Sequence, residues 1–221
     1  MKKVLLIAGF VAASSITAFA QTISFGVKAG LNLSRLTETV SGGSVSSQTL
    51  PGFQVGGVVD LGFQAFSIQP GVFFTTKGGK SEETVQFTTP GSGQTTITAN
   101  SKVTLNYIEV PINFLYNVAA GDNKFYVGAG PYVGYGLSGK GTESDNQNGS
   151  ETTKTNVTFG SGQDDVKNPD FGVNFLVGFK FSQGYSIGAN YGLGLSNLSN
   201  GGNDSKVKNQ VVSFTLGYFF N

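Results

Sequence analysis

Two kinds of side chain alternate along Phe171-Gly172-Val173-Asn174-Phe175-Leu176-Val177-Gly178-Phe179-Lys180-Phe181. Every odd position carries a bulky apolar residue, whereas the even positions carry Gly, Asn or Lys, with the single exception of Leu176. Successive side chains of a β-strand point to opposite faces, so a period of two predicts a strand with one apolar and one polar face. A helix would repeat its apolar residues about every three to four positions instead.

The same alternation recurs in seven further segments, which gives eight predicted strands. Long polar connections alternate with short ones. An even number of strands joined in this way is typical of an antiparallel transmembrane β-barrel, with both chain ends on the side of the short turns. The predicted strands are 23–33, 53–63, 66–74, 108–116, 125–137, 171–181, 185–195 and 212–220, the long connections are 34–51, 78–102, 139–169 and 197–209, and the short ones are 64–65, 117–124 and 182–184.

The two faces of these strands differ in bulk as well as in polarity. One face is rich in Phe, Tyr, Val, Ile and Leu, and the other consists mostly of Gly, Ser, Asn and Gln. Small polar residues cannot fill a dry core at native packing density. We therefore expect the apolar face to contact lipid and the polar face to line the lumen, the reverse of a soluble barrel such as a lipocalin.

Four charged residues fall within the predicted strands, namely Lys28, Asp60, Glu109 and Lys180, and all four lie on the polar face. Because an unpaired buried charge is costly, we expect them to form a structural charge network inside the lumen. Carboxylates with basic partners also permit an enzymatic interpretation. Known outer-membrane hydrolases and acyltransferases usually depend on a His base, which this chain lacks, so we predict no catalytic residue.

Aromatic residues flank the predicted short turns and the end of the last strand. Membrane barrels carry aromatic girdles at the bilayer interfaces, so these residues predict a girdle on the periplasmic side. The alternative is that they are ordinary core aromatics of a β-rich protein. The residues of the predicted girdle are Phe63, Phe66, Tyr116, Phe125, Phe181, Tyr185, Tyr218 and Phe220.

The N-terminal segment has the three parts of an export signal. Lys2 and Lys3 precede an apolar run at 4–13, and Ala18-Phe19-Ala20 fits the small-x-small cleavage rule. This apolar run is too short to span a bilayer core of about 30 Å. We predict a signal peptide at 1–20 and a barrel domain at 21–221, with an N-terminal membrane anchor as the alternative.

Composition excludes several classes of function. The 221-residue chain contains no Cys and no His, which removes disulfides, thiolate zinc sites and imidazole bases. The formal net charge is +1 and Arg35 is the only arginine, so a nucleic-acid surface is not expected. An eight-stranded barrel encloses a lumen that side chains can fill, whereas an open pore needs about sixteen strands. General porin activity is therefore not expected either.

Two segments resemble ligand motifs only superficially. Residues 134–140 match the pattern G-x-x-x-x-G-K, but Gly141 stands where a phosphate-binding loop needs Ser or Thr, and we expect 139–141 to begin a flexible loop. The acidic residues at 145–151 and 164–165 do not keep EF-hand spacing, so we expect a solvated loop there. We predict no metal site and no cofactor.

The strand at 108–116 contains an irregularity. Val103, Leu105 and Tyr107 lie on the opposite parity from the apolar residues that follow, which indicates a bulge near Tyr107 or a strand that begins later. Three prolines fall inside predicted strands, and we expect them at strand ends, bulges or points of strain because proline removes a ladder hydrogen bond. They are Pro70, Pro111 and Pro131.

Three segments carry a resemblance to a known family. They are 25–32 (FGVKAGLN), 105–112 (LNYIEVPI, with a Tyr-x-Glu-x-Pro element) and 125–132 (FYVGAGPY). The chain resembles the eight-stranded outer-membrane β-barrel family of Bacteroidetes-type bacteria, often called PorT-like, over residues 22–221. The resemblance implies an outer-membrane location and, in some members, a role in secretion, and it implies no catalytic residues.

We therefore expect a monomeric outer-membrane barrel with periplasmic termini and a structural or surface-interaction role through four long loops. Its expected partners are outer-membrane lipid, the barrel-assembly machinery that would read Tyr218, Phe219 and Phe220, and secretion or surface proteins. A soluble, exported, calycin-like binding barrel and an outer-membrane lipid-modifying enzyme are the alternatives.

Overall fold

A computed structural model describes residues 22–40, 43–89, 93–145, 152–162, 165–200 and 205–220. The predicted signal peptide, residues 1–20, lies outside the described residues. The described chain is built of strands. They are β1 (Thr22–Val40), β2 (Gly43–Ser46), β3 (Leu50–Phe63), β4 (Phe66–Thr89), β5 (Gly93–Ala120), β6 (Asn123–Asp145), β7 (Thr152–Val157), β8 (Asp170–Lys180), β9 (Tyr185–Gly194) and β10 (Ser205–Phe220).

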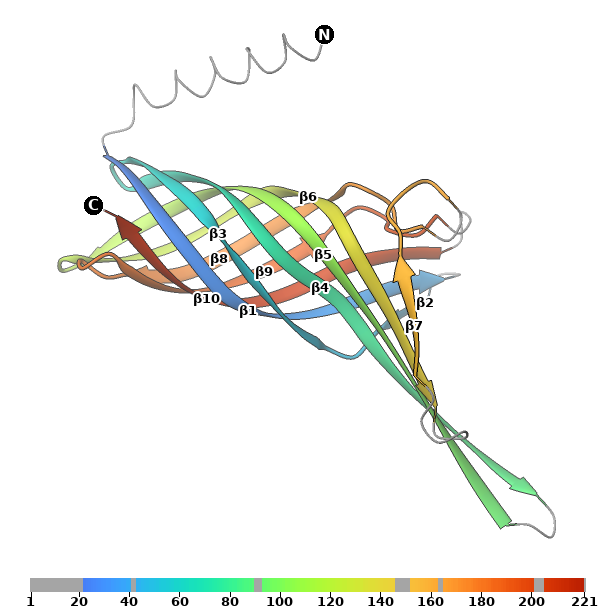
Figure 1. Cartoon of the computed structure of the whole chain (residues 1–221). Coiled ribbons are helices and arrows are strands. Elements are labelled where there is room, and N and C mark those ends of the chain that lie inside the picture. The colour runs from blue at the N-terminus through green and yellow to red at the C-terminus, as the bar shows by residue number, and fades with distance from the viewer. Residues whose placement is uncertain are drawn as a thin grey trace.

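Eight of the strands close into an antiparallel ring. Their order is β1-β3-β4-β5-β6-β8-β9-β10, and β10 pairs again with β1, from Phe25 opposite Phe220 to Val40 opposite Ser205. The short strands β2 and β7 add to β1 and β6 at the end where the long connections lie. The eight-stranded barrel predicted from the sequence is confirmed, and β1 begins where β10 ends (Figure 1).

Tight turns join neighbouring strands at the end of the barrel where β1 begins and β10 ends. Gln64 and Gly121 adopt left-handed backbone angles, with φ of 56° and 64°, in the turns between β3 and β4 and between β5 and β6. The predicted connection at 117–124 is too wide, because β5 runs to Ala120 and β6 begins at Asn123. Chain ends and short turns thus share one rim of the barrel.

The segments predicted as long loops are largely strand, which corrects the expectation from sequence. The ladder between β4 and β5 continues to Thr89 opposite Gly93, so a long hairpin projects beyond the ring (Figure 1). These segments are rich in threonine, which favours extended backbone. Alternation is lost there because both faces are polar, although the strands continue.

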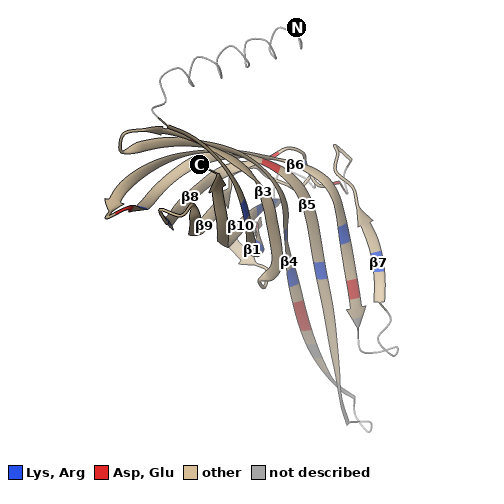
Figure 2. Cartoon of the chain, turned by 60° about the vertical axis from the view of Figure 1, so that its left-hand side comes forward, with Lys and Arg blue, Asp and Glu red and all other residues tan. Residues whose placement is uncertain are grey.

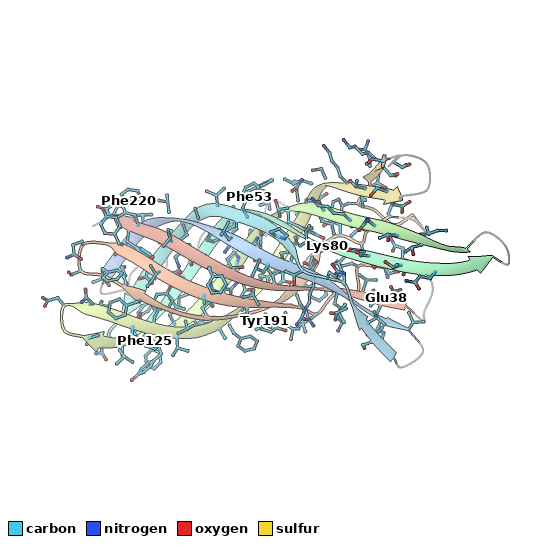
Figure 3. The ribbon with its side chains drawn as sticks, turned by 90° about the horizontal axis from the view of Figure 1, so that it is seen from below. Glu38, Phe53, Lys80, Phe125, Tyr191 and Phe220 are labelled. Atoms are coloured by element: carbon cyan, nitrogen blue, oxygen red, sulfur yellow. The ribbon has the colours of Figure 1, made fainter. Side chains whose placement is uncertain are left out.

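Apolar and polar side chains lie on the predicted sides of the barrel wall. The large apolar side chains point outward, and Leu31 and Leu216 are 68% and 69% exposed. In Figure 3, Phe53, Phe125, Tyr191 and Phe220 project away from the ribbon. Inward-facing polar residues such as Asn32 and Ser213 are buried and hydrogen-bonded to each other across β1 and β10.

The irregularity near Tyr107 lies on the neighbouring strand rather than on β5. Leu105 and Tyr107 both face the lumen and are buried, so the alternation of β5 is unbroken. In β6 the register shifts between Ser138, opposite Asn106, and Gly136, opposite Tyr107. The intervening residue of β6 forms a bulge that exchanges the two faces of this strand.

The prolines, expected at strand ends, bulges or points of strain, lie inside strands rather than at strand ends, at positions where the ladder is interrupted. Each leaves a gap in the ladder on one side and keeps its pairing on the other: Pro70 pairs with Ile112, Pro111 with Tyr132 and Pro131 with Val173. The gaps face β3, β4 and β5 respectively. One missing N–H per strand is therefore tolerated within a closed wall.

Candidate functional site

One cluster of charges fills the lumen towards the short turns. Lys180 lies 3.4 Å from Asp60, and the Lys28 ammonium donates a 2.6 Å hydrogen bond to Gln69. Gln69 in turn donates to Asp60 over 3.5 Å. The two ammonium groups lie 5.6 and 3.8 Å from the centre of the Phe219 ring, within the range of cation–π attraction. This cluster ties β1, β3, β4 and β8 together.

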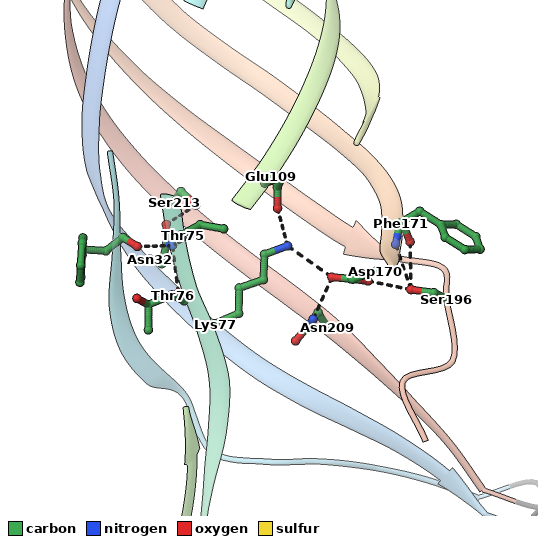
Figure 4. Close-up of polar contacts among 11 residues, drawn as sticks. Asn32, Thr75, Thr76, Lys77, Glu109, Asp170, Phe171, Ser196, Asn209 and Ser213 are labelled. Atoms are coloured by element: carbon green, nitrogen blue, oxygen red, sulfur yellow. Dashed lines mark hydrogen bonds and ion pairs between the residues drawn. The ribbon is translucent and has the colours of Figure 1, made fainter. Parts of the chain in front are cut away.

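A second cluster lies further towards the long connections and is deeply buried (Figure 4). The Lys77 ammonium lies 2.5 Å from Glu109 and 3.5 Å from Asp170. Asp170 also accepts hydrogen bonds from Ser196 (2.7 Å) and Asn209 (2.9 Å). Each carboxylate therefore has a cationic partner, and Asp170 has two neutral donors besides.

The four predicted lumen charges thus fall into two groups rather than one. Lys28, Asp60 and Lys180 are together, whereas Glu109 pairs with a lysine that the sequence analysis missed. Lys77 and Asp170 were missed because the predicted strands ended at 74 and began at 171. Both lie on the polar parity, so extending the alternation by a few residues would have found them.

Little free space remains between the clusters. A cavity of about 40 Å³ is lined in part by Asn113, Asn174 and Asn190, enough for only a few waters. Above the second cluster the ring of Tyr107 packs edge-on against Phe159, at 5.4 Å between centroids. Among the described residues the lumen is therefore a packed interior, as expected for eight strands.

The aromatic residues of the predicted girdle gather at the rim of the short turns. The rings of Phe66 and Tyr116 are tilted towards each other with centroids 5.2 Å apart, and the ring of Tyr218 lies 5.2 Å from that of Tyr185 and 5.4 Å from that of Phe220. The remaining members are also at this rim: Phe63 is paired with Phe66, and Phe125 and Phe181 are exposed.

At the opposite end three strands of the ring continue past it and β7 joins their edge, which forms a polar sheet that we call the outer sheet: residues 78–89 of β4, 93–104 of β5, 139–145 of β6, and β7. It projects obliquely from the barrel (Figure 1). Residues 139–141, expected to begin a flexible loop, are part of β6 and pair with both β5 and β7. The pattern G-x-x-x-x-G-K therefore lies in a strand and forms no phosphate-binding loop.

The predicted acidic loop is described only in part, since 146–151 and 163–164 lie outside the described residues. The Asp165 carboxylate accepts hydrogen bonds from the Thr158 hydroxyl and from the backbone N–H of Gly162, at 2.9 Å for the latter. These two donors hold its pKa below the usual range of an aspartate. Within the described residues, no three His, Cys, Asp or Glu side chains are grouped so that they could hold a metal ion.

Within the described ranges there is no helix long and apolar enough to cross a membrane.

The closed ring, its outward apolar wall and its paired internal charges define the class of small outer-membrane β-barrels. The family model described as "Outer membrane protein beta-barrel domain" matches residues 19–200, and the chain belongs to this family. Its location is therefore the bacterial outer membrane, which excludes the soluble calycin-like alternative. No curated protein sequence matches the chain.

Solved structures of outer-membrane barrels are similar to this chain at low identity. The neisserial surface protein A has 15% identity, covers 90% of this chain and 100% of its own, and has a TM-score of 0.45. The attachment invasion locus protein Ail of Yersinia pestis has 16% identity, coverages of 88% and 98% and a TM-score of 0.38. The Escherichia coli outer-membrane protease OmpT has 11% identity, coverages of 91% and 97% and a TM-score of 0.32. Identities this low carry no conclusion about activity.

Proposed function

We propose that this protein is a non-enzymatic surface protein, in which the outer sheet makes the functional contacts and the barrel holds that sheet in the membrane. The observation that carries this proposal is the continuation of β4, β5 and β6 well beyond the apolar wall, with β7 added at their edge. An ordered, polar, four-stranded surface is a better platform for a partner than a mobile loop, because less conformational entropy is lost on binding.

The lumen offers little for catalysis or transport. The lumen carboxylates are all engaged: Glu109 and Asp170 by Lys77, and Asp60 by Lys180. A general acid or base must reach its substrate, but Glu109 and Asp170 lie inside a filled interior and the partly exposed Asp60 is paired with Lys180. We therefore assign a structural role to both charge clusters: they fix opposite walls of the barrel to each other.

The rim of short turns would face the periplasm. This orientation follows the usual arrangement of membrane barrels and places both chain ends and the aromatic girdle on the periplasmic side. The C-terminal aromatics from Tyr218 to Phe220 would then be available to the assembly machinery. We further propose a monomer surrounded by outer-membrane lipid, with no nucleic-acid partner.

The finer assignment to the PorT-like group rests on the Tyr-x-Glu-x-Pro element. Tyr107, Glu109 and Pro111 all face the lumen, and the Glu109 carboxylate pairs with Lys77. The element therefore helps to build the barrel interior. A partner that belongs to a secretion complex is a specific form of the surface-interaction role and would bind the same outer sheet.

The proposal is tested by photo-crosslinking in intact cells. A photoreactive residue at Thr98 in the projecting hairpin is expected to yield protein adducts, whereas the same residue at Val72 on the lipid-facing wall is expected to yield none. Replacing residues 81–101 with an Asn-Gly turn should abolish the function of the protein while the barrel still assembles. Adducts obtained only from Asp122, in a short turn, would show that the periplasmic rim makes the contacts and would refute the proposal.

A further inference from the structure

The two faces of the outer sheet carry opposite charges. Residues paired directly across neighbouring strands share a face, and one row of pairs runs from Lys80 through Lys102 and Thr142 to Lys154. Lys140, paired with Thr104, lies in the adjacent row of the same face. We call these four exposed lysines the lysine face; Figure 2 shows the basic positions on β4, β5, β6 and β7.

The acidic residues lie mainly on the other face. Glu143 pairs with Ser101, which pairs with Ser81, and Glu83 lies two residues further along β4. This acidic face continues the lumen side of the wall, because Leu105 and Gly139 pair on it and are buried. Glu82 is the one described acidic residue that shares the lysine face.

The lysine face continues the lipid-facing side of the wall. Along β4, β5 and β6 the outward rows change from apolar (Phe74, Ile108, Tyr135) to hydrogen-bonded and uncharged (Thr76, Asn106, Ser138) and then to lysine. Each row rises about 5 Å along the membrane normal for a strand tilted by about 40°. The lysines therefore stand about 5–10 Å beyond the uncharged row, next to the headgroup layer, which is about 5–8 Å thick.

The lysine face carries few counter-charges, because Glu82 is its one carboxylate among the described residues. Within the described part of the chain, no carboxylate lies within ion-pair distance of any of the four. Lys80 and Lys102 are directly opposite each other, an arrangement that like charges disfavour. A hollow of about 260 Å³ is lined by both lysines, by the hydrogen-bonding side chains of Gln48, Asn100 and Thr142, and by Glu82. Its two lysines outnumber its one carboxylate, so the lining has a net positive charge. An anion in this hollow would neutralise the opposed lysines and accept hydrogen bonds from its lining.

We propose that the lysine face binds the phosphate groups of lipids in the leaflet that surrounds the outer sheet. Charge complementarity selects an anion, and continuity with the lipid-facing wall selects a lipid as its source. Long lysine side chains can extend along the sheet so that their ammonium groups reach the headgroups. The contact would fix the depth and tilt of the barrel and would leave the acidic face free for a protein partner.

The test uses the folded barrel in phosphatidylcholine vesicles with spin-labelled phosphatidic acid or spin-labelled phosphatidylcholine. The wild-type protein should immobilise phosphatidic acid preferentially. Since a basic residue near an anionic surface contributes roughly a fivefold change in affinity, Lys80→Gln/Lys102→Gln should reduce the preference several-fold, most clearly at low salt. If this variant fails to fold, Lys154→Gln in β7, outside the ring, should still give a smaller reduction.

Thr153→Glu/Thr155→Glu is the matched control, because it changes net charge by the same two units on the opposite face of the sheet, where Thr153 and Thr155 pair with Glu143 and Gly141. It should retain the preference. An equal loss in both double variants would show a general charge effect, and an unchanged preference in the lysine variant would refute the proposal directly. Lysine-dependent binding of soluble dextran sulfate without a lysine-dependent lipid preference would assign the face to a soluble polyanion. This test measures contact with lipid, which surrounds the barrel at both rims, and not contact with a protein partner. A negative result would therefore overturn the lipid proposal and leave the proposed surface interaction standing.

Discussion

The wall of the barrel and the outer sheet are made from the same strands, yet their side chains follow different rules. Up to the level of Phe74, β4 and β5 place apolar residues outward and mostly polar residues inward. Beyond it the outward row becomes polar, although Tyr107 and Leu105 still face inward and are buried. The hydrogen-bonded ladder runs through this boundary without a shift between β4 and β5. Backbone pairing is therefore the same in both surroundings. The type of side chain alone differs between the part that faces lipid and the part that faces water.

The largest difference in stability between the barrel interior and the outer sheet should come from substitutions in the buried cluster around Lys77. Lys77→Met leaves Glu109 and Asp170 without a cation, and breaking a buried pair in this way costs about 3–5 kcal/mol. Urea unfolding in lipid vesicles should show this loss. Lys102→Met, on the exposed outer sheet, should change stability by less than about 0.5 kcal/mol. Equal effects would mean that the inner cluster is solvated.

A charge placed on the wall should be nearly as harmful. Val177 is 41% exposed on the outward face, so Val177→Lys puts an ammonium into hydrocarbon at about 2–4 kcal/mol near the midplane. The folded fraction after insertion into vesicles should fall well below that of Asn174→Lys, which faces the lumen. Asn156→Lys, an exposed site in β7, should insert like the wild type. Similar insertion of Val177→Lys and Asn174→Lys would mean that the faces are assigned wrongly.

Glycine-to-alanine substitutions should show a smaller difference in stability between the barrel wall and the outer sheet. A Cβ at Gly130 would lie 2.0 Å from the Ile112 carbonyl oxygen and 2.6 Å from the Asn113 Cα, so Gly130→Ala should destabilise the wall by about 1–3 kcal/mol. At Gly141 in the outer sheet the nearest atom is 3.7 Å away, and Gly141→Ala should be neutral within about 0.5 kcal/mol. Unfolding midpoints of the two variants provide the comparison.

The smallest effect concerns the loop around Asp165. Its folded-state pKa is depressed, so the hydrogen bonds to its carboxylate stabilise the loop at neutral pH and weaken as pH falls through the range of an ordinary aspartate and below. Amide exchange of Gly162 should accelerate, relative to its intrinsic rate, on acidification. Asp165→Asn should abolish that dependence, while the wall should show no matching change.

The sequence predicted the wall well because lipid on one side and a narrow interior on the other impose a strict period of two. Val177 and Asn174 could be assigned to opposite faces on that basis alone. Lys77 and Asp170 were not predicted because they lie just beyond the ends of the apolar rows. The pairing of Glu109 with Lys77 could not be predicted either, because it depends on distances across the lumen that a local sequence pattern does not contain. The outer sheet was mistaken for loops since its strands have water on both faces and lose the alternation that marks a strand.

The bulge of β6 at Leu137 has a consequence for how such a surface can change. Counting on from Tyr107 opposite Gly136 without an interruption would place Lys140 opposite Val103, on the side that continues the lumen. The inserted residue turns it outward instead. Loss or gain of one codon at this point would therefore exchange the positive and negative sides of everything β6 displays beyond the bilayer, without altering a single amino acid there.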